Sequence, residues 1–310
     1  MNFDWTKRPV AEWHGLLKLV PRSNYLQSLP HARAAGVHDR KNTRYGLIKI
    51  GGETVGLLAL QEIKLGPIHV VDLYRGPLWL VEDPPVDWLQ QFVALFDRTF
   101  PRRWLRRRRW LPEWQNSAEV QAMLQNSGFR SNGESYETIC LDLTKSLPVL
   151  RDEMKGKWRN ALVQGEKQNL TIKTDTTGAT AGLFLAQYDA DRRSKGYHGR
   201  SVRFLTEEIK AALSLNEGFI LWAYYGVAPI AGIFVLIHGQ TATYRVGWTT
   251  HAGRRCNAHN VLLWEAIKHL QRSNVTQFDL GGVEPQTAAG LTSFKKGLGG
   301  RALALPGIYQ

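Results

Sequence analysis

The chain shows the same order of hydrophobic and polar patterns twice. Its first half predicts helices over residues 24–35, 86–98 and 116–126, and strands over residues 45–50, 54–63, 68–74, 103–110 and 136–143. Its second half predicts helices over residues 150–168, 179–193, 204–214 and 258–272, and strands over residues 219–225, 230–237, 241–248 and 276–280. Helices, a sheet rich in hairpins, a further helix and a closing strand therefore occur in each half. We expect an α+β protein with two domains, residues 1–145 and 146–310.

Short turn and capping signals set the limits of several elements. Gly51 and Gly52 predict a tight hairpin between two strands, because glycine tolerates the positive φ that such turns need. Gly36 is expected to follow the end of the first helix. Asn116 and Glu119 are expected to form a capping box at the start of the helix that ends at residue 126.

Length and composition indicate a folded protein with a large core. The composition, 43% hydrophobic and 22% charged, argues against a disordered chain. The length of 310 residues is sufficient for two ordinary domains. Cys140 and Cys256 stand far apart without metal-binding spacing, so we expect neither a disulfide framework nor a metal site. Charges interrupt residues 1–20, and no stretch approaches the roughly 20 apolar residues of a membrane span. We therefore expect a cytoplasmic protein.

The net charge of +13 favours a polyanionic partner. RNA, anionic lipid or a diphosphate-linked substrate would be drawn to such a surface. If the partner is lipid, the protein would lie peripherally on the inner face of the membrane. A basic composition without any such partner is the alternative.

A lysine beside glycine-rich turns is the strongest candidate for chemistry. Lys295 stands shortly before Gly297 and shortly after the pair Gly281 and Gly282. Backbone amides freed by glycine, together with an ammonium group, suit a carbonyl oxygen that becomes negative, or a phosphate. Lys296 is the adjacent competitor. The alternative is an ordinary lysine at a helix end beside a capping glycine.

A basic segment in the middle of the chain is a candidate for binding anions. Lys155, Lys157 and Arg159 lie at positions i, i+2 and i+4 of a predicted helix, so Lys155 and Arg159 share one face. A solvated basic face without a ligand is the alternative.

An arginine-rich run over residues 102–110 is a candidate for binding tRNA. Its arginines alternate with apolar and aromatic residues, and a strand would place Arg106, Arg108 and Trp110 on one face. An exposed edge strand that repels neighbouring edges is the alternative. The histidines, among them His259, form no triad or metal spacing, and we expect them to be surface or core residues.

Several segments, in this order, resemble the Fem-type peptidyltransferases, which build peptidoglycan cross-bridges from aminoacyl-tRNA. They are residues 24–28, the Arg75-Gly76-Pro77 turn, the basic run 154–160, the segment 192–204, and the stretches 278–282 and 294–299. The resemblance implies two tandem acetyltransferase-like (GNAT) domains with mixed, mostly antiparallel sheets flanked by helices. The sequence shows no long pair of charged helices, so we expect no coiled-coil arm.

The resemblance also implies roles for individual residues. It makes Lys295 the catalytic cation, which stabilises negative charge on the ester carbonyl oxygen or on the departing ribose oxygen. We expect substrate-binding side chains at Arg75, Lys155, Lys157, Arg159, Arg200, Tyr244 and Lys296. No cofactor or metal is expected, because aminoacyl-tRNA is itself the activated donor. Where some family members carry an acidic residue three places after the proline, this chain has Leu80, which leaves the proton acceptor unassigned.

The combined expectation is an aminoacyltransferase that joins the aminoacyl group of a charged tRNA to an amine acceptor. The acceptor is a peptidoglycan precursor, a peptide or amino-acid metabolite, or a lipid headgroup, and it can carry a phosphate. An N-acyltransferase that uses acetyl-CoA or another acyl-CoA is the first alternative, although the loop 254–259 lacks the glycines with which such enzymes hold a pyrophosphate. A non-catalytic module that binds RNA or a membrane is the second, and it would not need Lys295.

Overall fold

The chain divides into two units, one of residues 1–137 with 303–310 and the other of residues 138–302. The computed structural model describes residues 1–5, 10–133, 136–283 and 289–310. The sequence placed the domain boundary at residue 145. The units differ from that expectation because the strand near residue 140 pairs within the second sheet, and because residues 303–310 return to the first unit.

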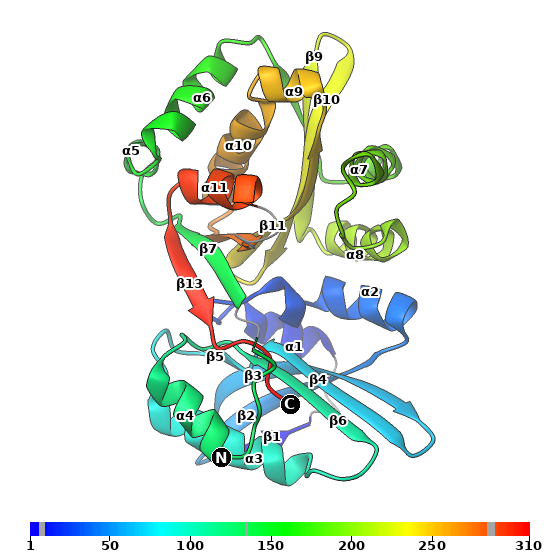
Figure 1. Cartoon of the computed structure of the whole chain (residues 1–310), viewed down its shortest axis with the longest axis vertical. Helices are drawn as coiled ribbons and strands as arrows, with labels where there is room; N and C mark the ends of the chain where they lie inside the picture. The colour runs from blue at the N-terminus through cyan, green and yellow to red at the C-terminus, as the bar shows by residue number, and fades with distance from the viewer. Residues whose placement is uncertain (6–9, 134–135, 284–288) are drawn as a thin grey trace. The chain divides into compact units, whose positions relative to one another are not determined.

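The first unit has one mixed sheet with helices on both faces (Figure 1). Its strands run in the order β1-β2-β3-β4-β6, with β5 beside β3, and β4 and β6 are parallel. Its elements are β1 (Asn2–Asp4), α1 (Val10–Leu17), the 3₁₀ turn η1 (Tyr25–Gln27), α2 (Leu29–Asp39), β2 (Asn42–Ile50), β3 (Glu53–Leu65), β4 (Ile68–Gly76), β5 (Leu78–Trp79), α3 (Val86–Thr99), β6 (Arg106–Pro112) and α4 (Ala118–Asn126).

Alternation along β3 supplies both cores of this unit. Leu57 and Ala59 pack with α1, whereas Leu58 and Leu60 point to the other face and pack with α3 and α4. The predicted hairpin at Gly51 and Gly52 is confirmed, with φ of 60° and 93° at the two turn positions.

Two predicted helix limits in the first unit are wrong. The helix predicted over residues 24–35 is α2, which begins at Leu29, because Ser28 caps it by accepting a hydrogen bond from the His31 N–H, and it continues through Gly36 to Asp39. The cap of α4 is Ser117, whose side chain accepts from the Val120 N–H, and not Asn116. At α4, a serine one position nearer to the helix competes better for the free amide.

The second unit has a sheet in the order β13-β7-β12-β11-β10-β9-β8, with β11 and β12 parallel. The first residues of β7 and the last residues of β13 belong to the first unit. Figure 1 shows α7 and α8 on one face of this sheet and α5, α6, α10 and α11 on the other. Its elements are β7 (Tyr136–Asp142), α5 (Leu147–Asp152), α6 (Gly156–Glu166), β8 (Thr171–Asp175), α7 (Ala181–Lys195), α8 (Val202–Ser214), β9 (Gly218–Tyr225), β10 (Ala228–His238), β11 (Thr241–Thr249), α9 (His251–Arg255), α10 (Ala258–Arg272), β12 (Gln277–Gly282), α11 (Ala289–Gly297) and β13 (Arg301–Leu305).

Most of the predicted elements of the second unit are confirmed, with one exception. The apolar stripe of α10 is buried against the sheet as expected, through residues such as Leu262, Ile267 and Leu270. The single helix predicted over 150–168 is instead two helices. Met154 turns into the core, and the Lys155 N–H donates to the Gly297 carbonyl oxygen at 2.9 Å, so this tertiary contact breaks the helix.

The expectations about a coiled-coil arm and about a membrane span both concern the lengths of the helices. Among the described residues, the longest helices, α7 and α10, have 15 residues each. Within the same ranges, no helix combines the length and the hydrophobicity that crossing a bilayer requires.

Asp175 fixes the turn that leads into α7. Its carboxylate accepts hydrogen bonds from the N–H groups of Thr177, Gly178 and Thr180 and from the Thr180 hydroxyl. Burial raises the pKa of this carboxyl, but the hydrogen bonds outweigh burial and hold the pKa well below 3.8. A carboxyl with a lowered folded-state pKa stabilises the fold above about pH 4, and this contribution is lost as the pH falls further.

We expect Asp175→Asn to lower the free energy of unfolding at pH 7, measured in urea, by roughly 1 kcal/mol, because an amide nitrogen cannot accept the two hydrogen bonds from Thr180. The difference from the unchanged protein should narrow at pH 3, because the unfolded chain takes up a proton at Asp175 there while the folded carboxylate stays ionised. Asp142→Asn is the matched control, because Asp142 makes a similar turn with Thr144 in an exposed position. A difference that stays constant between pH 7 and pH 3 would contradict this account.

Candidate active site

The ammonium group of Lys295 is fixed at the end of β12. Lys295 is 6% exposed, and its Nζ donates to the carbonyl oxygens of Gly281 at 3.3 Å and Gly282 at 2.8 Å. Gly281 has a φ of 75°, a conformation that favours glycine, and its N–H donates to Asp279 Oδ1 at 2.7 Å. The turn after β12 therefore orients two carbonyl oxygens toward one buried cation.

The parallel strands β11 and β12 stop pairing beside this turn. Thr241 to Thr243 pair with residues 277–279, and among the described residues the pairing goes no further. Gly281 nevertheless stays close to β11, since a β-carbon added there would lie 3.4 Å from the Tyr244 carbonyl oxygen and 3.6 Å from Lys295 Nζ. The Tyr244 carbonyl oxygen and Lys295 Nζ thus both approach the same glycine.

A β-bulge in β11 sets the direction of the side chains at this point. Tyr244 is opposite Val235 and Val246 is opposite Phe234, so Arg245 is an extra residue in β11. Arg245 turns to α8, where its Nε donates to the fully buried Glu208 at 2.8 Å. Tyr244 points to the other face, which α10 covers.

Tyr244 pairs with His259 in the first turn of α10. Tyr244 Oη lies 3.0 Å from His259 Nε2. The ring of Phe294 meets the His259 ring at an interplanar angle of 80°, with 6.0 Å between centroids, and Phe294 directly precedes Lys295. The hydroxyl and imidazole thus lie beside Gly247 and are linked through Phe294 to the helix that carries Lys295.

Burial sets the charge state of the tyrosine and the histidine. It raises the pKa of Tyr244 above 10, with further increases from Asp191 and Tyr188. It also lowers the pKa of His259 to about 4, with a smaller contribution from Lys195. Near neutral pH, both groups are uncharged. With the hydroxyl as donor to Nε2, the imidazole proton resides on Nδ1, which is buried without a hydrogen-bond partner in the described part of the chain.

His259 is expected to stay unprotonated until the pH approaches 4. Because its folded-state pKa lies below the ordinary 6.5, the unfolded chain takes up the proton first, and acid between pH 6.5 and about 4 favours unfolding. NMR of the ring Cε1–H should therefore show a titration midpoint near 4, with His259→Gln used to assign the signal. That variant should also lose less stability than the unchanged protein between pH 7 and pH 5. A midpoint near 6.5 would contradict the prediction.

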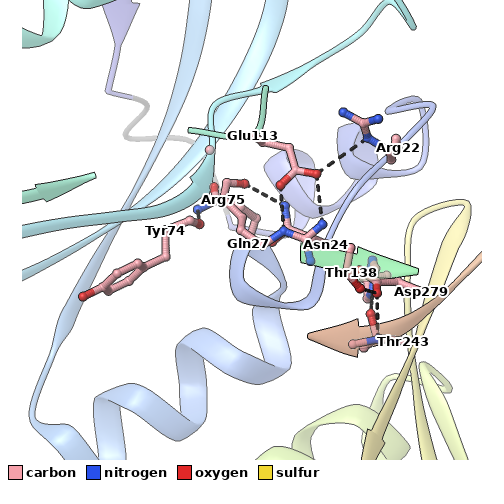
Figure 2. Close-up of polar contacts among 12 residues, drawn as sticks. Arg22, Asn24, Gln27, Tyr74, Arg75, Glu113, Thr138, Thr243 and Asp279 are labelled. Carbon is pink, nitrogen blue, oxygen red and sulfur yellow. Dashed lines mark hydrogen bonds and ion pairs between the residues drawn. The ribbon is translucent and has the colours of Figure 1, made fainter. Parts of the chain in front are cut away.

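Asp279 is a buried carboxylate beside the same turn. It is 1% exposed, and its Oδ1 accepts hydrogen bonds from the Thr138 hydroxyl and from the Gly281 N–H (Figure 2). These contacts tie β12 to β7 and fix the glycine turn that holds Lys295. Asp279 lies in a motif of the sequence that does not by itself indicate its role. The burial of His259 has a local signal, because His259 lies three, four and seven residues before the buried Leu262, Leu263 and Ala266, a spacing that marks the inner face of a helix.

The basic residues around α6 lie on the surface. Lys155 and Lys157 are exposed, and Arg159 is half-buried, with its Nη1 3.5 Å from Asp152 Oδ1. Helix α6 itself packs on α11, because Trp158 contacts Phe294 with 5.8 Å between ring centroids. This packing places the start of α6 next to the helix that carries Lys295. Lys296, the neighbour of Lys295, is half-buried.

Arg200 lies in the connection between α7 and α8. Its side chain is exposed, and its guanidinium lies over the Phe204 ring at 4.8 Å from the centroid. The Arg200 carbonyl oxygen accepts from the Tyr188 hydroxyl at 3.3 Å, which fixes the connection to α7.

Arg75 is buried in the first unit and has an acidic partner there. It is 1% exposed, and its Nε and Nη2 donate to the two carboxylate oxygens of Glu113 at 2.7 and 3.0 Å (Figure 2). Asn24 donates to the Arg75 carbonyl oxygen at 2.7 Å, and Arg22 lies 3.6 Å from Glu113. A substrate-binding role for Arg75 stays a prediction, and the structure adds a role in stability.

Arg106 and Arg108 lie on the edge strand β6 and are engaged within the first unit. Arg108 is 5% exposed; its Nη1 donates to Asp97 and to the Phe100 carbonyl oxygen, and its guanidinium lies over the Phe129 ring. Arg106 Nε donates to His69 Nδ1 at 3.2 Å. Their contact with tRNA stays a prediction; the more exposed arginines of the run are Arg102, Arg103 and Arg107.

One family model and several solved structures are similar to this chain. Residues 150–296 match a family described as an acetyltransferase (GNAT) domain. No curated protein matches the sequence. Among the described residues, no three His, Cys, Asp or Glu side chains lie together as a metal site would require.

The similar solved structures include three that align with nearly the whole chain. FemX aligns with 100% of this chain and 96% of its own length, at 13% identity and a TM-score of 0.79. The C-terminal domain of a candidate lysylphosphatidylglycerol synthetase from Agrobacterium fabrum covers 96% of this chain and aligns over 90% of its own, at 14% identity and a TM-score of 0.57. For a tandem GNAT protein from the clavulanic acid biosynthesis pathway, the shares are 97% and 93%, at 13% identity and a TM-score of 0.50. The chain thus has the tandem fold of FemX, and residues 150–296 match an acetyltransferase (GNAT) domain, as the sequence resemblance predicted.

Proposed function

We propose that the chain is an aminoacyltransferase that forms an amide bond between the aminoacyl group of a charged tRNA and an amine acceptor. One observation carries the proposal: the buried Lys295 cation is fixed by the carbonyl oxygens of Gly281 and Gly282, at a glycine that also lies against the Tyr244 carbonyl oxygen. The fold shared with FemX is consistent with it.

The reaction requires little of the protein beyond positioning the two reactants and stabilising negative charge on oxygen. The acceptor amine attacks the ester carbonyl carbon, a C–N bond forms, and the C–O bond to the ribose breaks. The proton that the amine loses ends on the departing ribose oxygen, and a neighbouring ribose hydroxyl can carry it there. Lys295 would stabilise the negative charge on the carbonyl oxygen or on the departing oxygen. Because the ester is already activated, holding the two reactants in line supplies most of the remaining acceleration.

Tyr244 would bind the substrate through its hydroxyl, and His259 would orient that hydroxyl. The histidine suits this role because it is uncharged near neutral pH and faces the hydroxyl through Nε2. Arg200, Lys155, Lys157, Arg159 and Lys296 are proposed to bind the anionic parts of the acceptor or the tRNA backbone. A lipid headgroup, a peptidoglycan precursor and a small peptide remain the acceptor classes.

Acyl-CoA as donor is the second candidate function, and the match of residues 150–296 to an acetyltransferase domain favours it. The start of α10, where such enzymes hold a pyrophosphate, is less suitable here. A β-carbon added to Gly165 of α6 would lie 3.2 Å from the carbonyl oxygens of Cys256 and Asn257 and 2.7 Å from Val261. Helix α6 therefore packs against this turn and leaves less room for a pyrophosphate.

The test follows the label from each donor. The protein is incubated with a cell extract and either tRNA charged with radiolabelled amino acids or radiolabelled acetyl-CoA. We expect label from the tRNA in a product that resists RNase, and the product then identifies the acceptor. Label that arrives only from acetyl-CoA would show that the donor proposed here is wrong.

A further inference from the structure

Three large apolar side chains are exposed at one end of the first sheet. Trp104 is 88% exposed, Leu65 is 70% exposed and Ile68 is 43% exposed. Leu65 and Ile68 flank the turn between β3 and β4, and Trp104 lies in the segment 101–105 that leads into β6. We call these three residues the apolar tip. Clustered exposed side chains of this size mark an interaction surface.

Backbone pairing brings the two parts of the apolar tip together. The His69 N–H donates to the Leu105 carbonyl oxygen at 2.9 Å, and the parallel pairing of β4 with β6 begins with His69 opposite Arg106. The C-terminal end of β3 therefore lies at the same end of the sheet as the N-terminal ends of β4 and β6. Trp104 immediately precedes the contact residue Leu105, and Ile68 immediately precedes His69.

Exposed cations stand close to the residues of the apolar tip in the chain. They are Lys64, Arg102, Arg103 and Arg107, which we call the cationic rim. The positive field also acts on Arg106, whose pKa is lowered first by burial and then by Arg103 and Arg108. Glu62 is turned inward, since it is 2% exposed and its carboxylate lies 2.8 Å from His69 Nε2. The outer surface therefore combines an apolar centre with a positive border.

A polar network beneath the apolar tip holds the segment 101–105 in place. Arg106 Nε donates to His69 Nδ1 at 3.2 Å, and its Nη1 donates to the Pro101 carbonyl oxygen at 2.9 Å. With Nδ1 as acceptor, His69 Nε2 carries the proton and donates to Glu62. The segment is thus braced at both ends, so that little ordering is required when it meets a partner.

We infer that the apolar tip and the cationic rim dock the protein on an anionic lipid bilayer, with Trp104, Leu65 and Ile68 entering the headgroup region. Apolar side chains gain free energy by leaving water, and tryptophan favours the interface between headgroups and acyl chains. Each lysine or arginine near an anionic surface adds an attraction that salt weakens. The inference concerns the first unit alone and does not depend on the acyl donor.

The composition of the apolar tip favours lipid over RNA. Surfaces for single-stranded RNA combine cations with aromatic rings on which bases stack. Leu65 and Ile68 are aliphatic and offer no such ring. Two of the three exposed side chains of the apolar tip therefore cannot stack on a base. Aliphatic side chains beside a tryptophan suit the headgroup region of a bilayer.

The test measures sedimentation of the full chain with vesicles of phosphatidylcholine, with or without phosphatidylglycerol. The unchanged protein should bind the vesicles that contain phosphatidylglycerol and should detach in high salt. Leu65→Ser with Trp104→Ser should lower the partition coefficient about tenfold or more, through the lost apolar contact. Arg103→Glu with Arg107→Glu should have an effect of similar size through charge. The matched control is Val227→Ser, because Val227 is 97% exposed at the β9–β10 turn of the second unit, and it should bind as before.

A second measurement locates the indole. Lipids brominated on their acyl chains should quench part of the fluorescence of the unchanged protein, and Trp104→Phe should remove that part, although the chain has 11 tryptophans. Equal quenching in both proteins, or equal sedimentation of the Leu65/Trp104 variant, overturns the inference. A gel shift with tRNA distinguishes the other partner: variants that lose tRNA but keep vesicles would assign this surface to RNA and exclude the docking proposed here.

Discussion

Lys295→Ala is expected to lower kcat about 10²- to 10³-fold, the range measured when one group that stabilises a developing oxyanion is removed. The physical reason is that the cation is fixed before the reaction begins. It is buried, and the carbonyl oxygens of Gly281 and Gly282 hold it in one position. The measurement is transfer from charged tRNA under saturating acceptor, with circular dichroism as the check on the fold.

Two further variants test whether charge at this position is what matters. Lys295→Arg keeps the charge and should retain more activity than Lys295→Ala. Lys268→Ala removes a lysine of α10 that is paired with Glu265, and it should change kcat less than twofold. Near-normal turnover by a folded Lys295→Ala protein would falsify the proposed mechanism.

Arg75→Met is expected to lower the free energy of unfolding by about 3–5 kcal/mol, as is typical when one partner of a buried ion pair is removed. The Glu113 carboxylate would remain buried without the two guanidinium hydrogen bonds that it receives in the unchanged protein. Methionine keeps most of the aliphatic volume, so the loss reports mainly on the charge. Unfolding in guanidinium chloride, followed by tryptophan fluorescence, measures it.

The double variant Arg75→Met with Glu113→Met separates stability from substrate binding. Replacing both partners by apolar side chains removes the unpaired charge, so this protein should be more stable than Arg75→Met alone. If Arg75 also binds substrate, the double variant should recover stability but not activity. If Arg75→Met impairs turnover without any loss of stability, the role assigned to the ion pair is wrong.

The sequence predicted the parts of the fold that depend on local signals. The stripe of α10 and the glycines of the first hairpin carry their own periodicity or turn chemistry, and both were found as expected. The break between α5 and α6 depends on the hydrogen bond from Lys155 to Gly297, a residue far along the chain. The placement of β7 depends on its pairing with β12, and no local pattern shows which sheet a strand will join.

The candidate site, too, was predicted only where its signals are local in the sequence. Lys295 was identifiable because the glycines that surround it are close in sequence. The pair of Tyr244 and His259 joins two elements, and its charge state depends on burial that the sequence does not show. Arg106 and Arg108 were correctly placed on one face of a strand. Their partners Asp97 and His69 come from α3 and β4, so their engagement within the protein could not be foreseen.

The return of residues 303–310 to the first unit constrains the order of events during synthesis. Tyr309 is 1% exposed, and its backbone exchanges two hydrogen bonds with that of Trp110, at 2.7 and 2.9 Å. All of residues 138–302 lie between these two partners in the chain. On the ribosome, the nascent first unit must therefore wait with one side of Trp110 uncovered until the whole second unit has emerged. A nascent chain at this stage would expose part of the first core to any chaperone at the exit tunnel.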